Sequence, residues 1–110
     1  MNSRINFQTV LEDLLGSRQV YFQRPNSVRM DYPAIVYRLS DIQVREANNH
    51  KYKKAKCYEV ILIDKNPDSI FVDKLEDLPY SSFSRHYVTD NLNHWVFQIY
   101  YFYEGDINHG

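Results

Sequence analysis

The sequence predicts an α+β domain: a mainly antiparallel four- to six-stranded sheet with two helices packed on one face. Three observations support this fold class: two segments with helical spacing of apolar residues, several segments of strand length that alternate or run apolar, and turn-forming residues between them. With 110 residues, the chain has the size of a single domain spanning residues 1–110. We expect residues 1–5 and 104–110 to be flexible.

The first predicted element is a helix over about Asn6–Leu15, with Gly16 as its C-terminal cap. It rests on apolar residues at helical spacing: Phe7, Val10, Leu11, Leu14 and Leu15. Two strands are then expected, at Val20–Gln23 and Pro33–Leu39, with the turn residues RPNS between them.

The polar middle of the chain favours little regular structure. We expect a weak strand at Ile42–Glu46, followed by a loop or hairpin tip where Asn48 and Asn49 break the pattern. Next, Lys56–Asp64 is apolar on both faces, which is typical of a strand covered on both sides, so we place it at the centre of the sheet.

The last third predicts a helix and two strands. Phe71, Leu75 and Leu78 have helical spacing, with Asp68 or Ser69 as the N-terminal cap and Pro79 as the end. Alternation predicts a strand at Ser81–Thr89, and after the turn DNLN the aromatic run from Trp95 to Tyr103 supplies the last strand.

The net charge of −1 gives no general reason to bind nucleic acid or an anionic membrane. The distribution is uneven, because residues 1–55 hold nine Lys/Arg against five Asp/Glu and residues 56–110 hold four against nine. If the fold separates the two halves, one side of a copy is complementary to the other side of the next. If folding mixes them, this asymmetry has no consequence.

Residues that could support catalysis or bind a metal are sparse. Gly-rich phosphate loops and zinc patterns are absent, and Cys57 lies in the most hydrophobic predicted strand, where a thiol is usually inert. We interpret His86 and His94 as surface or half-buried residues beside tyrosines. The acidic residues around the second helix are interpreted as a solvated face, although carboxylates can hold a divalent cation. We therefore expect no enzyme activity, no metal and no cofactor.

One basic stretch raises the possibility of a nucleic-acid contact. The run HKYKK, His50–Lys54, places lysines around a tyrosine at the expected hairpin tip. Five residues are few for an electrostatic footprint, and a tip that contacts a neighbouring protein explains the run equally well. No nucleic-acid partner is expected, and with no apolar leader at Met1–Asn6 and no run long enough for a membrane span, no membrane partner either.

The final strand carries aromatic residues on both faces. Trp95, Phe97, Ile99, Tyr101 and Tyr103 alternate with Val96, Gln98, Tyr100 and Phe102. Two helices cannot cover both faces of the sheet, and tyrosine is enriched at protein interfaces. We therefore expect another chain to cover one face. The interface candidates are Trp95, Phe97, Tyr100, Tyr101, Tyr103, Arg45, Lys51, Lys53 and Lys54.

Several segments, quoted as they stand, carry a family resemblance: YFQ-P, YPAIVY, ID-PDS and F-RHY-DNLNH, within roughly residues 9–103. With these the chain resembles small proteins of tailed bacteriophages and prophages that are encoded among the head–tail joining genes, the tail completion or tail terminator proteins. The resemblance implies a non-enzymatic structural protein that forms a ring, often a hexamer, at the head-proximal end of a long flexible tail.

In that setting the implied partners are other copies of the chain, the tail-tube protein and the head connector or completion proteins. The implied locations are the bacterial host cytoplasm during assembly and the head–tail junction of the virion. We expect the polar loops Arg24–Asp31 and Arg45–Lys54 to contact adjoining rings and the edge strands to contact neighbours in the same ring. Two alternatives stay open: another head completion or minor capsid protein, and a small regulatory binding module resembling an inhibitor or antitoxin.

Overall fold

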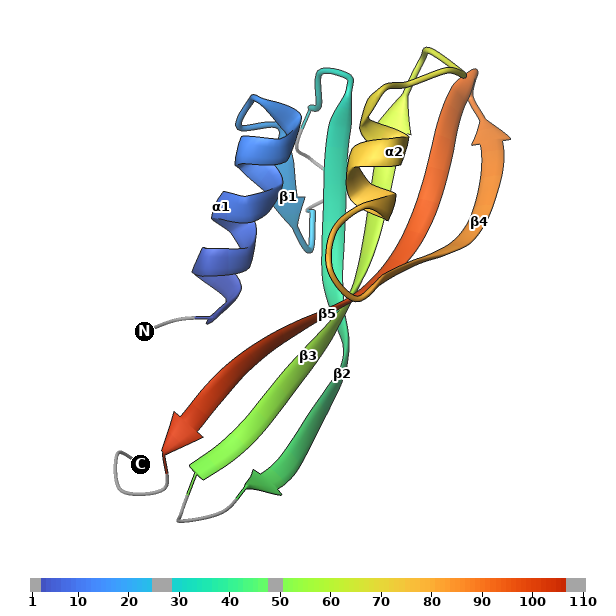
Figure 1. Cartoon of the computed structure of the whole chain (residues 1–110). Helices are drawn as coiled ribbons and strands as arrows, with labels where there is room; N and C mark the ends of the chain where they lie inside the picture. Colours follow the sequence, from blue (N-terminus) through green and yellow to red (C-terminus); the bar gives the residue numbers. More distant parts are fainter. Residues whose placement is uncertain (1–2, 25–28, 48–50, 107–110) are drawn as a thin grey trace.

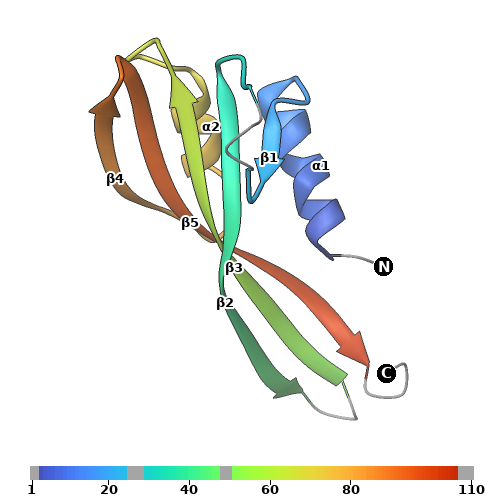
Figure 2. The same cartoon turned by 180° about the vertical axis from the view of Figure 1, so that it is seen from behind.

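Five strands form one sheet in the order β1-β2-β3-β5-β4, and both helices lie on the same face of it (Figure 1 and Figure 2). The computed structural model describes residues 3–24, 29–47 and 51–106, with side chains for 4–24, 29–42 and 55–102. The elements in chain order are α1 (Ser3–Leu15), β1 (Val20–Phe22), β2 (Ala34–Ala47), β3 (Lys51–Asp64), α2 (Phe71–Glu76), β4 (Ser81–Thr89) and β5 (Leu92–Asp106). The predicted α+β class is confirmed.

The sheet is mostly antiparallel, as predicted. Only β1 pairs in parallel, along Ile35–Tyr37 of β2, while β2 with β3, β3 with β5 and β5 with β4 are antiparallel. The strand β3 lies in the middle of this order, which confirms the central position predicted from its two apolar faces.

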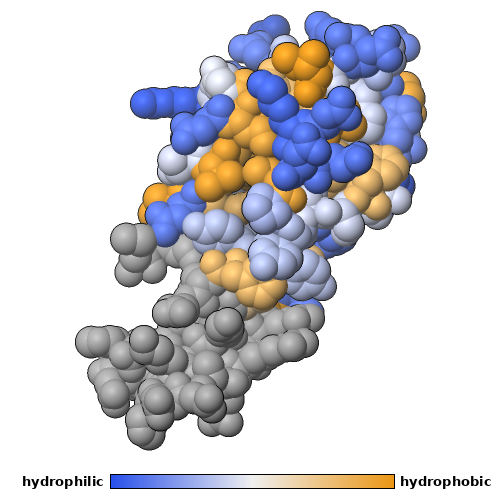
Figure 3. Space-filling view, in the orientation of Figure 1, coloured by the Kyte–Doolittle hydropathy of each residue, from blue (hydrophilic) through white to orange (hydrophobic). Residues whose placement is uncertain are grey.

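The main core lies between the sheet and the helices. Phe7 of α1 is at its centre, because its ring stacks on Tyr58 of β3 at 4.5 Å between centroids and meets the edge of Tyr37 of β2 at 5.6 Å. The buried residues of this core are Phe7, Leu11, Leu15, Val20, Ile35, Tyr37, Tyr58, Val60, Leu62, Leu75, Trp95, Phe97 and Ile99. Figure 3 shows further hydrophobic surface between the two helices on this side.

The helix α1 ends as the sequence predicts. Gly16 has φ of +72°, and its amide donates to the carbonyl of Glu12 at 2.8 Å. This left-handed conformation favours glycine, which explains the stop after Leu15. Gln8 fixes the helix to the sheet, since its amide group donates to the Val20 carbonyl at 2.9 Å and its carbonyl accepts from the Tyr37 hydroxyl.

The helix α2 is shorter than its pattern suggests. Its N-terminal cap is Ile70, with no side-chain hydrogen bond, so the predicted cap at Asp68 or Ser69 is wrong. The Ser69 hydroxyl accepts from the Phe71 amide at 3.4 Å, which closes a turn ahead of the helix instead. Further on, Asp90 and Asn91 both have positive φ, the conformation that a tight two-residue β-hairpin turn requires.

Three strands continue past the helices as an arm. We define the arm as Asp41–Ala47 of β2, Lys51–Cys57 of β3 and Tyr100–Asp106 of β5, and it projects away from both helices in Figure 1 and Figure 2. An irregularity between Leu39 and Asp41 marks its start. The arm gives the molecule its length, since the principal extents are 51 × 26 × 21 Å.

The arm confirms one expectation and corrects part of another. The strand expected at Ile42–Glu46 is present as the continuation of β2, whereas Lys51–Lys54, expected at a loop or hairpin tip, belong to β3, with Arg45 paired to Lys53 and Ala47 to Lys51. Backbone pairing in a ribbon does not require apolar side chains, so polar composition misled the prediction. Residues 3–5 belong to α1 and residues 104–106 to β5. Residues 1–2, 48–50 and 107–110 lie outside the described residues.

Candidate functional site

The outer edges of β1 and of β5 beyond Tyr100 lack a partner strand in the part of the chain that the structure describes. Two further unpaired edges lie on opposite sides of the sheet and carry large exposed apolar residues. One is the outer edge of β4, which ends the strand order. The other is the outer edge of β2 from Leu39 onward, because β1 covers only Ile35–Tyr37. Such edges expose amide and carbonyl groups in a row and invite pairing with another chain.

The strand β4 is exposed along almost its whole length, yet it carries large apolar residues. Phe83, Tyr87 and Val88 are 48%, 37% and 59% exposed. By pairing with β5, Phe83 and Val88 share the helix-bearing face with Phe97 and Asn93, whereas Tyr87 lies on the opposite face with His94. An edge strand with exposed aromatic residues on both faces is unusual in an isolated protein and typical of a contact surface.

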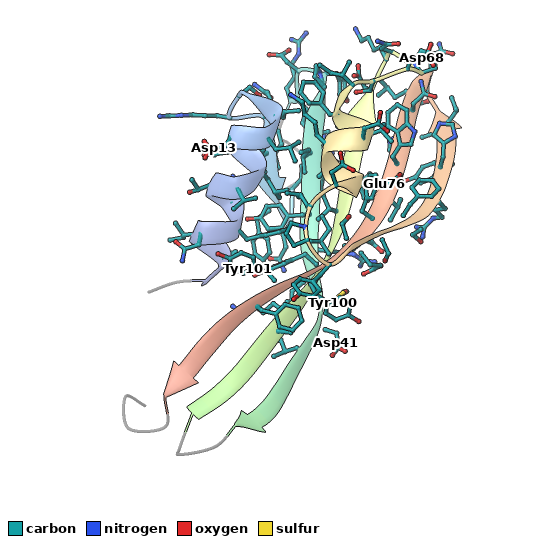
Figure 4. All side chains as sticks on the ribbon, in the orientation of Figure 1. Asp13, Asp41, Asp68, Glu76, Tyr100 and Tyr101 are labelled. Carbon is teal, nitrogen blue, oxygen red and sulfur yellow. The ribbon has the colours of Figure 1, made fainter. Side chains whose placement is uncertain are left out.

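The free edge of β2 also combines apolar and charged residues. Leu39 and Ile42 are 38% and 49% exposed, and Asp41 is exposed between them. A carboxylate oxygen of Asp41 accepts from the Ile42 amide at 2.8 Å, which holds the carboxylate beside the backbone. Figure 4 shows Asp41 at the start of the arm, near Tyr100.

Beside this edge lies an open depression of about 580 Å³. It begins where β1 ends, and the exposed Arg38, paired with Glu59 at 2.9 Å, forms part of its wall. The lining residues are Gln23, Arg24, Val36, Tyr37, Arg38, Leu39, Glu59 and Ile61. The depression therefore adjoins the strand that lacks a neighbour.

The face without helices is partly polar where β2, β3 and β5 cross into the arm. The Cys57 thiol donates to the Gln98 side-chain oxygen at 3.2 Å, and Ser40 donates to the same oxygen at 3.3 Å. Interaction with Cys57 raises the pKa of its strand neighbour Tyr100, with a smaller contribution from Asp41. The buried thiol thus has structural contacts on this face.

Next to this junction an aromatic pair stands in solvent. The rings of Tyr80 and Phe102 meet edge to face at 4.4 Å, although the two residues are 67% and 49% exposed. Tyr80 has φ of +60°, and its carbonyl accepts from the Tyr100 amide at 3.1 Å. The pair lies where β4 leaves the sheet and the outer edge of β5 becomes free.

The structure separates the sequence-predicted interface candidates. Trp95 and Phe97 are 7% and 0% exposed in the core, so their interpretation as interface residues is wrong. Their side chains lie on the face of β5 that α1 and α2 cover. Tyr101 is half-buried against Phe7 at 5.4 Å, and Tyr100 is half-buried on the other face. The side chains of the remaining candidates lie outside the described residues: Tyr103, Arg45, Lys51, Lys53 and Lys54.

The two histidines of the last strands do not meet. His86 pairs with Trp95 and His94 with Tyr87, which places the two rings on opposite faces. His94 stacks on Tyr87 at 4.6 Å, as the expectation of a histidine beside a tyrosine implies, and His86 bonds to the Asn93 side chain at 3.0 Å.

The acidic residues around α2 are spread over its surface. Asp68 and Glu76 lie well apart at the top and on the helix in Figure 4. Across the described side chains, no group of three or more His, Cys, Asp or Glu residues is arranged to hold a metal ion. Among the described helices, none is long and apolar enough to cross a membrane.

Sequence reasoning missed the exposed apolar residues of β4 and the free edge of β2. A signal for β4 was present, since SSFSRHYVT combines β-branched and aromatic residues with no acidic residue. Edge strands are expected from the sequence to contact neighbours in the same ring, but the sequence does not identify β2 or β4 as those strands. No protein-family model matches this chain, and no curated protein matches it in a sequence search.

Proposed function

We propose that this chain is a structural protein of a tailed bacteriophage or prophage, of the tail terminator or tail completion type. It forms a ring at the head-proximal end of the tail, ends the growth of the tail tube and joins the tail to the head. It contacts other copies of itself, the tail-tube protein below and head connector or completion proteins above.

One observation carries this proposal: two of the free strand edges lie on opposite sides of the sheet, and both expose apolar residues. The edges are different surfaces, β4 on one side and β2 from Leu39 onward on the other. Copies that join through two different surfaces form a ring when the rotation between them closes. The sequence resemblance to head–tail joining proteins points to the same kind of assembly.

The strand order gives the charge asymmetry a spatial meaning. Residues 20–47 supply β1 and β2 at one side of the sheet, whereas residues 81–106 supply β4 and β5 at the other. Residues 20–47 hold four Arg against three Asp or Glu, and residues 81–106 hold one Arg against three, so the side with β2 has the more positive balance. This arrangement supports attraction between successive copies, which salt weakens.

The arm supports the second part of the proposal. It extends beyond both helices, and of its faces only the base at Tyr101, 5.4 Å from the ring of Phe7, is covered by a described helix (Figure 1). In a ring, six or so such arms lie at the same end and form one continuous surface. We assign this surface to the contact with the adjoining ring of the tail or the connector.

The test combines a physical and a biological measurement. Light scattering coupled to size exclusion, at several protein and salt concentrations, should give a ring that dissociates as salt rises. A phage or prophage that lacks the gene should produce tails of uncontrolled length that do not attach to heads, and the intact gene should restore both. Normal tails without the gene would contradict the proposal, as would a stable one-to-one complex with an unrelated enzyme or toxin, which is the mark of a regulatory module.

A further inference from the structure

We propose that copies join by adding β4 of one copy, in antiparallel register, to the free edge of β2 in the next, with Arg85 opposite Asp41. The inference deepens the proposed ring, on which it rests, by naming the two strands and the register. Its occupant is a second copy of this chain.

The direction of pairing follows from the sheet itself. β5 is antiparallel to β3 and β3 to β2, while β4 is antiparallel to β5. The strand β4 therefore runs opposite to β2 within each copy. In a ring whose axis runs roughly along the strands, every copy keeps the same strand direction. β4 then meets the β2 of its neighbour in antiparallel orientation, the slightly more stable kind of pairing.

Charge selects the register. In the strand β4, Arg85 is the one Lys or Arg residue, and the strand has no Asp or Glu. Through Val96, Arg85 lies on the face without helices. Asp41 lies on the same face through Cys57, and it is the acidic residue with a described side chain on the free part of β2. Directly opposite charges on one face stabilise a strand pair, so Arg85 lies against Asp41.

The neighbouring positions then agree without further adjustment. Each strand has one irregularity, Leu39/Asp41 in β2 and Phe83/Arg85 in β4, where one residue is extra. Skipping the extra residue brings Ile42 opposite Phe83, both on the helix-bearing face and 49% and 48% exposed. The interface thus buries an exposed apolar pair beside the charge pair.

On the N-terminal side of Asp41, the paired residues of β2 line the depression. Tyr87 lies on the face without helices and comes opposite Arg38, which forms part of the depression wall. Tyrosine under an arginine is a favourable contact. The pairing stops there, because the next outward carbonyl, that of Tyr37, already accepts from the Gln23 amide at 3.0 Å. β4 of the neighbour therefore continues the line of β1 where β1 ends.

The same register has the geometry of a closed ring. Within one copy, Arg85 is level with Val36 through Val96 and Ile61. Placing it opposite Asp41 of the next copy steps four paired positions along β2, since Ser40 is the extra residue, or about 13 Å at about 3.3 Å per position. Each copy adds four strand positions, β2, β3, β5 and β4, or about 19 Å at about 4.8 Å each. The resulting slope of about 35° lies at the lower end of the roughly 35–45° tilt of closed barrels.

Local and overall charge act at different ranges. The acidic member of the pair belongs to the basic half of the sequence and the basic member to the acidic half, so the pair sets the register at contact. The more positive balance of the β2 side and the more negative balance of the β4 and β5 side act at longer range and favour encounter.

The experiment uses charge reversal and mixing. Asp41→Arg gives a copy with arginine at both positions, and Arg85→Asp gives a copy with aspartate at both. Each alone should raise the protein concentration at half-assembly about tenfold or more, since like charges oppose each other at every contact. The double variant Asp41→Arg/Arg85→Asp should assemble nearly as wild type. So should an equimolar mixture of the two single variants, because alternating copies restore every pair.

The matched control is Asp13→Arg, which makes the same charge change on the outer surface of α1 (Figure 4). It should leave the half-assembly concentration within about twofold. If wild type forms rings and both single variants form them at the same protein concentration, the strand pairing is overturned. The proposed function is left standing by that result. Weakened variants that neither the double variant nor the mixture rescues would overturn the register.

A cross-link provides an independent reading. Ile42→Cys with Phe83→Cys places two thiols opposite each other across the contact, within the roughly 4.4–6.8 Å between Cα atoms that a disulfide spans. Oxidation should give a covalent ladder that ends at the ring size, whereas Ile42→Cys alone should give none. Cys57 is buried and present in every variant, so any cross-linking through it appears equally in the wild-type protein. Monomers after oxidation of assembled rings would contradict the pairing.

Discussion

The two ends of the same three strands are built differently. Near the helices, β2, β3 and β5 bury one face under α1 and α2, and Val60, Leu62 and Phe97 have no exposed surface. In the arm beyond Tyr101, which contacts Phe7 of α1, no described helix covers either face. Since the chain maintains a long, regular ribbon that its own core does not use, the arm and the free edges are best explained as contact surfaces.

The largest effect expected from the comparison is at the centre of the core. Phe7→Ala should lower the free energy of unfolding by about 3–5 kcal/mol, because it removes a buried ring that contacts three tyrosines. Urea unfolding followed by circular dichroism measures it. Phe102→Ala in the arm, matched in chemistry, should lower it by less than about 1 kcal/mol. Equal losses would break the distinction between the two regions.

The helix cap should give a smaller loss. Gly16→Ala should destabilise the fold by about 1–2 kcal/mol, because φ of +72° is strained for alanine while the added Cβ meets nothing within 4 Å. Thermal unfolding at fixed protein concentration measures it. Gly16→Asn is the control and should lose less, since asparagine tolerates this conformation better. An unchanged melting temperature in Gly16→Ala would contradict the view that the left-handed conformation at position 16 favours glycine.

The pH dependence should also report on the core. Burial raises the pKa of Tyr37 above its usual 10.0, opposed by a hydrogen bond and the charge of Arg4. The stability linked to this group is complete below about pH 10 and is lost as pH rises through the raised value of the folded state. Urea unfolding at pH 8 and pH 11 should show this loss, and Tyr37→Phe should lose less between the two. A Tyr37→Phe variant with the same loss would contradict the assignment.

The smallest effect on stability is expected at the free edge, where the effect on assembly is largest. Phe83→Ser should change the free energy of unfolding by less than about 1 kcal/mol, because the side chain is 48% exposed. Its half-assembly concentration should rise severalfold through the lost contact with Ile42. Denaturation of monomers and light scattering separate the two. A variant that unfolds easily yet assembles normally would reverse the roles given to core and edge.

The sequence predicted most of the helix-covered half because periodicity reports on burial. Helix α1, its Gly16 cap and the central strand β3 follow from apolar spacing and one special conformation. The arm was predicted poorly, since its strands are held by backbone pairing that Lys and Arg positions permit as well as apolar ones. Trp95 and Phe97 were misread for a related reason: an aromatic run does not reveal which face the helices cover.

Hydrogen exchange in the assembled state, compared with the monomer, tests the central claim most directly. The amides of Leu39–Val44 in β2 and of Ser81–Tyr87 in β4 should exchange markedly more slowly on assembly, while those of α1 and of β3 beside the helices stay unchanged. Slower exchange confined to the outer surfaces of α1 and α2, with both edges unchanged, would contradict assembly through the free strands.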